Sequence, residues 1–306
     1  PYILKIETCI HDGWLALRNL SNQIDTDYLY YKINGSYLQQ RFDSLASGTG
    51  VKNLKRETVM SIKFSLPPLP EQKKIAEILS TWDEAIEKQQ ALIKQKKSLK
   101  KGLMQQLLTG KKRFSEFVTS EKLKETKIGM VPEDWEVVRL GDIADIGTGS
   151  SNKVDAKKEG QYAFFDRSGD KLFSTKYLHD AKSIIIPGEG AKFIPKYYEG
   201  KFDLHQRAYY IKNLNGYEIK FLYYQFFDRQ NYLLSYAVGS TVKSLRLPIF
   251  TKMLIPLPRL SEQKKIASVL STADEEIELL EQELESLKQQ KKGLMQKLLT
   301  GEVRVK

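Results

Sequence analysis

Basic, amide and hydroxyl side chains gather in short stretches of the second half of the sequence. The candidate contacts are Arg167, Ser168, Lys171, Lys192, Lys196, Tyr197, His205, Gln206, Arg207, Ser240, Thr241 and Lys243. Arginine and lysine can bond both acceptors of guanine, glutamine can bond adenine, and serine, threonine and lysine commonly hold phosphates. These residue types are ones that could contact DNA. Any single member equally fits an ordinary solvated position, and Arg207 also fits a structural ion pair.

Other kinds of chemistry are poorly supported. Three histidines (His11, His179 and His205) and the single Cys9 form no metal-ligand spacing, and we predict no metal, no cofactor and no catalytic residue. An acidic nuclease triad can be drawn from Asp180, Glu199 and Lys201, but such spacing arises often by chance in a chain with 28% charged residues. The stretch Gly147–Ser151 lacks the Gly-Lys-Ser/Thr ending of a phosphate loop and is interpreted as a turn.

Composition fits a polyanionic partner. The chain has 306 residues, 41% of them hydrophobic, and a formal net charge of +11. Much of that excess lies in residues 70–113, which hold 11 basic and 5 acidic side chains. With one cysteine, no secretory pattern and no long apolar run, the expected location is the cytoplasm, with no membrane partner.

An internal repeat organises the sequence. Residues 71–81 recur as residues 262–272, with nine of eleven positions identical at an offset of 191. At the same offset, Gly102–Gly110 recurs as Gly293–Gly301. Upstream, residues 48–54 match residues 239–245, which adds Lys52 to the candidate DNA contacts as the equivalent of Lys243. The period is too long for a solenoid, so it predicts two copies of a module: a globular part followed by a long helix.

Each copy ends in a predicted helix, residues 69–110 and 259–301, that follows a proline-rich stop and finishes at Thr-Gly. Apolar residues at alternating spacings of four and three predict a coiled-coil seam, so the two helices should pack on each other. The seam residues are Ile75, Leu79, Trp82, Ile86, Ile266, Leu270, Ile277 and Leu284.

Lysines of the first helix have two interpretations. The five are Lys94, Lys96, Lys97, Lys100 and Lys101. They could follow a DNA backbone, or form a solvated helix face, which we favour. Lys96 and Lys100 occupy seam positions and could instead face a partner subunit.

The part between the helices is predicted to be mixed α/β. Residues 111–127 form a polar connector, and Ile128–Ile143 opens the second globular domain. Apolar runs at residues 162–165, 183–188 and 208–211 predict strands, and residues 217–234 predict a helix.

This order of motifs resembles the specificity subunits of type I restriction–modification enzymes over the whole chain. The resemblance rests on the openings Val131–Trp135 and Val138–Ile143, on Gly239-Ser240-Thr241 and Leu257-Pro258, and on the duplicated Glu-Gln-Lys-Lys-Ile-Ala helix start. It implies an α+β protein with two target-recognition domains, an antiparallel coiled coil as spacer, double-stranded DNA as ligand, and two methyltransferase subunits plus restriction subunits as partners that supply the chemistry.

The expected organisation follows from the repeat and the resemblance. Residues 1–68 are the C-terminal part of the first recognition domain, 69–110 the central helix, 111–127 a linker, 128–258 the second domain and 259–306 the distal helix. The second domain takes about 130 residues before its helix. About 60 residues are therefore expected to be missing ahead of Pro1. A metal-dependent nuclease and a scaffold without recognition are the alternatives.

Overall fold

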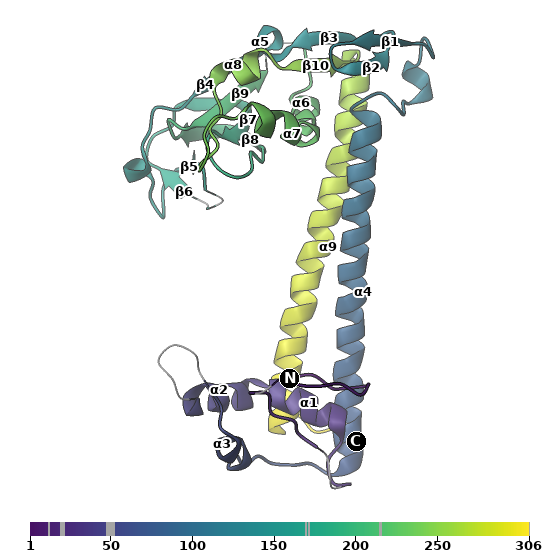
Figure 1. The fold of residues 1–306 in the computed structure, drawn as a ribbon, viewed down its shortest axis with the longest axis vertical. Helices are drawn as coiled ribbons and strands as arrows, with labels where there is room; N and C mark the ends of the chain where they lie inside the picture. Colours follow the sequence, from purple (N-terminus) through teal and green to yellow (C-terminus); the bar gives the residue numbers. More distant parts are fainter. Residues whose placement is uncertain are drawn as a thin grey trace. The chain divides into compact units, whose positions relative to one another are not determined.

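The computed structural model describes residues 1–11, 13–18, 22–46, 53–168, 170, 172–213 and 216–305, so the candidate contacts Lys52 and Lys171 lie outside the described residues. The chain divides into two compact units. Unit 1 comprises Pro1–Gln95 and Ile277–Lys306, and unit 2 comprises Lys96–Glu276. Each unit contains part of both long helices, α4 and α9 (Figure 1).

The two predicted long helices are confirmed as α4 (Leu69–Leu107) and α9 (Leu260–Thr300). Both are followed by a glycine with positive φ, +72° at Gly110 and +80° at Gly301. A left-handed residue at this point ends an α-helix, and glycine adopts it without a Cβ clash. At Gly110 an added Cβ would also lie 2.5 Å from Pro132. Both the positive φ and the close approach of Pro132 therefore require glycine at this position.

The residues predicted at the helix seam are buried or half-buried: Ile75, Leu79, Trp82, Ile86, Ile277 and Leu284 in unit 1, and Ile266 and Leu270 in unit 2. Residues further along α4 contact residues nearer the start of α9. In unit 1, Gln89 Nε2 donates to the Leu280 carbonyl at 3.0 Å, and in unit 2, Lys96 Nζ lies 2.5 Å from Glu276. Asp83 also pairs with Lys291 in unit 1, and Lys100 with Asp274 in unit 2, so within each unit the helices run antiparallel.

One set of contacts occurs in both units. In unit 2, the Tyr224 hydroxyl donates to Asp274 Oδ2 at 2.7 Å, and Lys100 pairs with the same carboxylate. In unit 1, the equivalent Tyr31 donates to Asp83 at 2.8 Å, and Lys291 pairs with Asp83. Each ammonium also lies over the tyrosine ring, at 5.4 Å for Lys100 and 5.3 Å for Lys291.

These contacts account for the lysines that interrupt the apolar seam. The ammonium groups of Lys96 and Lys100 meet Glu276 and Asp274 of the same chain. A lysine stem can cover apolar surface while its charged end reaches a carboxylate, so a seam tolerates it. Lys94, Lys97 and Lys101 are exposed on α4.

A double-mutant cycle on Lys100→Met and Asp274→Asn tests this pairing. Lys100 is only 15% exposed and Asp274 40% exposed, so we expect a coupling of roughly 0.5–1 kcal/mol in the free energy of unfolding. Lys88 and Glu84 provide the control, because both are more than two-thirds exposed at 81% and 68%. A cycle on Lys88 and Glu84 should give a coupling near zero, and equal values for the two pairs would contradict the prediction.

The repeated Glu-Gln at each helix start holds the preceding segment. In unit 2, Gln263 Oε1 accepts the Glu218 N–H at 2.9 Å, and its Nε2 donates to the Pro258 carbonyl at 2.8 Å. In unit 1, Gln72 Oε1 accepts the Asp25 N–H at 2.8 Å, and its Nε2 donates to the Pro67 carbonyl at 2.8 Å. Both glutamines are buried with every polar atom used, which explains why the sequence repeats them.

Among the described residues, the regular elements in the globular part of unit 1 are three short helices. They are α1 (Thr26–Asn34), α2 (Ser36–Leu45) and α3 (Arg56–Met60). Asp25 caps α1 by accepting the Tyr28 N–H at 2.9 Å. The buried cluster of this unit joins α1 to the start of α4 and the end of α9, through Tyr28, Tyr31, Ile75, Ala76, Leu79, Leu298 and Leu299.

Unit 2 is built on a six-stranded sheet in the order β4-β9-β7-β8-β5-β6, in which β5 runs parallel to β8 and the other neighbours are antiparallel. Its strands are β4 (Ala144–Thr148), β5 (Tyr162–Phe165), β6 (Leu172–Ser174), β7 (His179–Pro187), β8 (Lys196–Leu204) and β9 (Ala208–Asn213). The strands predicted at 162–165, 183–188 and 208–211 are thus confirmed as parts of β5, β7 and β9. The α+β class is confirmed.

The apolar half of β7 is buried on both faces of the sheet. Ile184 and Ile186 of β7 join a cluster with α6 (Ile219–Asp228), α7 (Gln230–Tyr236), α8 (Leu247–Thr251) and the two long helices. Ile185, which points the opposite way, joins Phe202, Leu204 and Ala208. Burial on both sides explains the unbroken apolar run in β7. Figure 1 shows α6 and α7 between the sheet and the long helices of unit 2.

Two elements differ from the prediction. The single helix expected at 217–234 is two helices, α6 and α7, because Arg229 between them has φ −100° and ψ 21°. The expected connector contains η1 (Ser115–Phe117) and β1 (Leu123–Thr126), which forms a hairpin with β2 (Gly129–Pro132). β1 is almost wholly exposed and polar, so it carries no apolar signal.

The remaining short elements lie before the sheet, between β4 and β5, and between the sheet and α9. They are β3 (Glu136–Arg139), α5 (Leu140–Ile143), η2 (Lys153–Asp155) and β10 (Leu254–Leu257). β3 pairs antiparallel with β10, directly before α9 begins, so the opening and the end of the globular part meet at the helix start.

Candidate nucleic-acid interface

Three loops of unit 2 meet at one carboxylate. Glu189 follows β7, Arg167 follows β5 and Arg207 precedes β9. The guanidinium groups of both arginines contact Glu189, with Nη1 of Arg167 3.2 Å and Nη1 of Arg207 3.0 Å from its oxygens. Each arginine side chain remains 58% exposed, whereas Glu189 is 18% exposed. The carboxylate therefore orients two arginines whose outer surfaces stay open to solvent.

The His205–Arg207 turn is held from both sides. His205 Nδ1 accepts the backbone N–H of Arg207 at 3.0 Å, and Gln206 Nε2 donates to Asn152 Oδ1 at 2.7 Å. Gln206 and Arg207 are exposed. Arg207 thus forms the structural ion pair that was one of its two predicted alternatives, and its guanidinium stays exposed; its contact with DNA stays a prediction.

Lys196 and the loop after α7 complete this group. Lys196 Nζ donates to the Ser168 carbonyl at 3.2 Å, and the Ser168 hydroxyl is bonded to Asp166. The Gly190 N–H donates to the Lys243 carbonyl at 3.0 Å, so the loop with exposed Ser240, Thr241 and Lys243 adjoins Glu189. We name Arg167, Ser168, Glu189, Lys196, His205, Gln206, Arg207 and Lys243 the Glu189 cluster.

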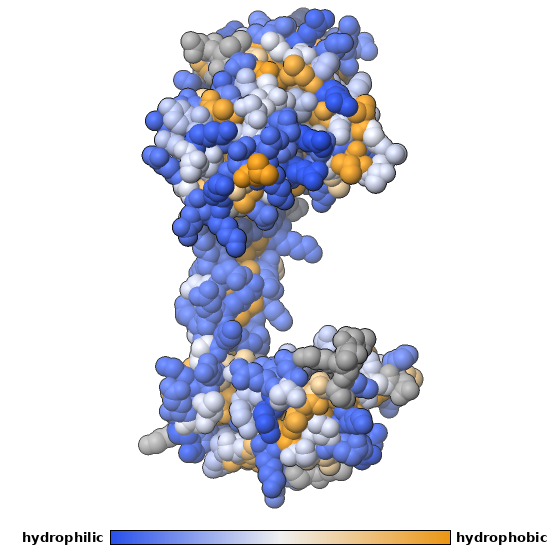
Figure 2. Space-filling model, turned by 90° about the vertical axis from the view of Figure 1, so that its left-hand side faces the viewer, coloured by the Kyte–Doolittle hydropathy of each residue, from blue (hydrophilic) through white to orange (hydrophobic). Residues whose placement is uncertain are grey.

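Not every predicted contact belongs to this cluster. Tyr197 is partly buried; its ring lies 6.1 Å from Tyr223 and its hydroxyl donates to exposed Glu199 at 3.2 Å. Burial raises the pKa of Tyr197 to about 12, so this hydroxyl stays protonated. Lys192 is exposed on the loop that joins β7 and β8. The face of unit 2 in Figure 2 is mostly hydrophilic, with apolar side chains in small groups.

Comparison with known proteins decides the family. A family model described as the type I restriction modification DNA specificity domain matches residues 3–96 and 132–289. The chain belongs to this type I specificity family. It is 30% identical over 335 residues to the type I restriction enzyme MjaVIII specificity subunit of Methanocaldococcus jannaschii. The match covers 95% of this chain and 73% of that protein.

Other members are similar over comparable lengths. This chain is also 30% identical over 320 residues to the putative type I restriction enzyme MjaX specificity subunit of the same organism. The match covers 99% of this chain and 74% of that protein. A crystal structure of the type I restriction–modification S subunit from M. genitalium has a TM-score of 0.63 at 20% identity, covering 90% of this chain and 73% of the other. That likeness confirms the fold.

The sequence analysis did not predict Glu189, although its carboxylate contacts both arginines of the cluster. A usable signal was present, because an acidic residue between Gly188 and Gly190 directly after an apolar strand is a loop position. Asn152 and Asp166 were missed as well, and no sequence pattern marks them. They hold Gln206 and Ser168 and so fix the neighbours of the arginines.

The strand register brings the residues of the alternative nuclease triad near one another, but Glu199 and Lys201 each have another neighbour. Asp180 and Lys201 lie opposite each other on β7 and β8. Glu199 pairs with Lys182 at 3.2 Å, and Lys201 Nζ lies 4.8 Å from the Tyr177 ring centroid. Within the described residues, no group of three or more His, Cys, Asp or Glu side chains is placed to hold a metal ion.

The glycine stretch after β4 has a structural role. Gly149 packs so close to β8 that an added Cβ would lie 1.8 Å from the Leu204 carbonyl oxygen. The Ser151 hydroxyl is used inside the unit, donating to buried Asp203 at 2.7 Å. Among the helices of the described segments, none is long and apolar enough to cross a membrane.

Unit 2 should lose stability as the pH falls below about 6.5. Burial lowers the pKa of His179 below its ordinary 6.5, and nearby Lys212 lowers it further. Burial also lowers the pKa of His205. Below 6.5 the unfolded chain therefore binds more protons than the folded chain, so the free energy of unfolding falls with falling pH. Urea midpoints measured across this range should show it, and His179→Phe should flatten the dependence. An unchanged dependence in that variant would contradict the assignment.

Proposed function

We propose that this chain is the DNA sequence-recognition subunit of a type I restriction–modification complex and performs no catalysis itself. The observation that carries the proposal is the Glu189 cluster, in which two half-exposed arginines are held by one carboxylate beside exposed Lys243 and Gln206. A guanidinium that is oriented before binding loses less conformational freedom when it bonds a base edge.

Each member of the cluster has a proposed role. Arg167 and Arg207 bond guanine O6 and N7 in the major groove, and Gln206 bonds adenine. Lys196, Lys243 and the hydroxyls of Ser240 and Thr241 hold phosphates and fix the register on the duplex. When DNA binds, Glu189 still accepts hydrogen bonds from the guanidinium nitrogens that do not contact a base.

The wider organisation follows the internal repeat. Residues 1–68 and 128–258 act as recognition domains for the two halves of a split site, and residues 69–110 and 259–306 form the spacer, joined by the linker 111–127. The duplicated Tyr–Asp–Lys contacts support this, because they fix each globular part to the helix pair in the same way. Two methyltransferase subunits and the restriction subunits dock on this frame and act on cytoplasmic DNA.

Selection from random duplexes tests the proposal. The chain, copurified with a methyltransferase subunit, should enrich a sequence with two conserved blocks separated by a fixed spacer. Methylome mapping of cells that carry both proteins should show adenine methylation in the same motif. If no sequence is enriched while the complex still assembles, the chain is a scaffold without recognition. Magnesium-dependent cutting by the chain alone that is lost in Glu199→Gln would favour the nuclease alternative.

A further inference from the structure

The turn that carries Arg207 is held by its own backbone amides. The N–H groups of His205 and Gln206 donate to carbonyls of neighbouring segments at 2.9 Å, and the Ala208 N–H donates to the His205 carbonyl at 3.0 Å. The Arg207 N–H donates instead to the imidazole Nδ1 of His205, at 3.0 Å. Three of the four acceptors are therefore carbonyl oxygens, and the fourth is a nitrogen that can bind a proton.

The bond to Nδ1 depends on the charge of the ring. An imidazole nitrogen accepts a hydrogen bond only when it carries no proton, so this turn requires His205 to be neutral, with its hydrogen on Nε2. In the protonated ring both nitrogens are donors, and the Nδ1 hydrogen would point at the Arg207 N–H. Protonation of His205 therefore removes the acceptor of the Arg207 amide and sets two donors against each other.

The backbone of Arg207 also determines where its guanidinium lies. Its carbonyl accepts the Gly188 N–H at 2.8 Å, and a Cβ on Gly188 would lie 2.5 Å from that carbonyl oxygen, so the turn packs directly on the loop that carries Glu189. The Arg207 guanidinium contacts Glu189 at 3.0 Å. A turn that moves away from this loop takes the guanidinium with it, and a bidentate contact with guanine tolerates little displacement.

Charged side chains face His205 from three segments. Asp166 and Arg167 follow β5, Glu189 follows β7, and Arg207 belongs to the same turn. Burial lowers the pKa of His205 below its ordinary 6.5; Asp166 raises it, Arg207 and Arg167 lower it, and Glu189 raises it. With its pKa lowered, the ring is neutral above pH 6.5 and gains its proton as the pH falls below that value. The Arg207 amide is therefore held at neutral pH and released in acid.

Other carboxylates near the turn are bonded to uncharged groups. Asp155 of η2 accepts the Asn152 N–H at 2.8 Å. Buried Asp203 accepts the hydroxyls of Ser151 at 2.7 Å and Ser174 at 2.8 Å. These carboxylates keep their bonds when the imidazole gains a proton.

We propose that His205 is a positioning residue that makes base reading by Arg207 depend on the protonation of its ring. The neutral ring holds the turn in the reading geometry, and the protonated ring releases it. This inference rests on the proposed function, because it deepens the role of the Glu189 cluster in recognising DNA. The added charge of the protonated ring attracts phosphates, so binding to DNA persists in acid while the preference for the target falls.

His205→Asn is the decisive variant. An asparagine Oδ1 accepts the N–H two residues ahead, which is the bond that His205 Nδ1 makes to Arg207, but an amide does not titrate. His205→Leu removes the acceptor altogether. Each full chain, copurified with a methyltransferase subunit, is titrated by anisotropy at fixed salt against the selected duplex and an unrelated duplex. The titrations run from about pH 8 to about pH 5.5, on either side of the ordinary histidine pKa.

The expected result is a different pH profile for each chain. The ratio of target to unrelated binding should fall at least about fivefold in the wild type between these pH values, because part of an arginine–base contact is lost. His205→Asn should keep the high ratio at every pH, and His205→Leu should have a low ratio at every pH. A residue that only stabilised the fold would not give rescue by asparagine together with loss of the pH dependence.

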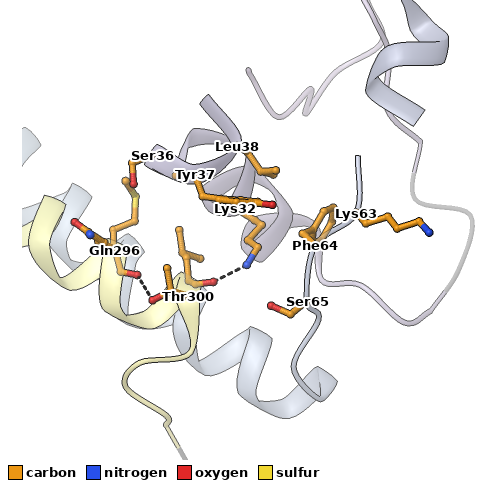
Figure 3. A pocket seen from close by; sticks show the side chains of 12 residues that line it. Lys32, Ser36, Tyr37, Leu38, Lys63, Phe64, Ser65, Gln296 and Thr300 are labelled. Atoms are coloured by element: carbon orange, nitrogen blue, oxygen red, sulfur yellow. Dashed lines mark hydrogen bonds between the residues drawn. The ribbon is translucent and has the colours of Figure 1, made fainter. Parts of the chain in front are cut away.

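Two controls separate His205 from other titrating groups. His205→Asn keeps the other groups whose pKa is displaced, among them His179 in unit 2 and Lys32, which donates to the Leu299 carbonyl in unit 1 (Figure 3). Their titration therefore affects both proteins alike. Nitrogen NMR of the histidine-labelled full chain, which has three histidines, identifies the His205 signals as those missing in His205→Asn and reports the tautomer directly.

Three outcomes would overturn the inference. The first is a preference for the target that depends on pH equally in the wild type and in His205→Asn. The second is a wild-type preference that does not change although NMR shows His205 gaining its proton. The third is a neutral ring with its hydrogen on Nδ1. A wild type without preference at any pH would instead be a failure of the proposed function, and the inference would fall with it.

Discussion

Replacing Arg113 with methionine is expected to lower the free energy of unfolding by about 3–5 kcal/mol. Arg113 is buried and bonds both Glu262, which is 1% exposed, and Asp134, which is 14% exposed. Methionine fills the volume but leaves two carboxylates without their cation, and an uncompensated buried charge is costly. Trp135 lies 5.7 Å from the guanidinium, so its fluorescence in urea titrations reports on this site.

The repeat supplies the control for Arg113. Arg304→Met removes the equivalent guanidinium from an exposed position and should shift the urea midpoint far less. Adding Glu262→Gln to Arg113→Met should recover part of the loss, because an amide oxygen can still accept the Trp135 N–H without a buried charge. Equal shifts for the two arginine variants would show that burial does not decide the cost.

Loss of both clustered arginines is expected to abolish most target binding. Arg167→Gln with Arg207→Gln should weaken binding to the selected sequence at least roughly 30-fold, since each arginine–base contact contributes about 1–3 kcal/mol. Titration of labelled duplex by anisotropy at fixed salt measures this. Binding to unrelated DNA should fall much less, because phosphate contacts supply it and Lys196 and Lys243 remain.

Two single variants sharpen the test of the cluster. Lys182→Gln removes an exposed charge that pairs with Glu199 outside the cluster and should leave the sequence preference intact. Glu189→Gln keeps both arginines but removes the carboxylate that orients them, so the ratio of target to unrelated binding should fall while unrelated binding rises. A preference that survives in the double arginine variant would exclude the cluster from base recognition.

Local patterns predicted the regular elements well. The seam spacing and the flanking Pro and Gly gave α4 and α9 to within a few residues, and the runs at 162–165 and 208–211 gave β5 and β9. These elements bury apolar side chains with a fixed period, and that period is visible in sequence. The exposed strand β1 has no such period and was missed.

The candidate site was less predictable because loops define it. Arg167, Glu189 and Arg207 are far apart in sequence and meet only because β5, β7 and β9 place their ends together. Residue type alone selected the arginines and lysines, but gave no reason to choose Glu189 and no reason to leave Tyr197 out. The partners of Lys100 and Lys291 were equally hidden, since each is a carboxylate on the other long helix.

The duplicated Tyr–Asp–Lys contacts have a consequence for how such proteins change over generations. The aspartates and lysines belong to α4 and α9, and only Tyr31 and Tyr224 come from the globular parts. A different globular part could attach to the same helices if it kept this tyrosine, the backbone groups that bond the buried glutamine, and apolar residues that pack on the helices. The loops that contact DNA can therefore change while the contacts with α4 and α9 stay the same. A change of target sequence does not require a change in the long helices.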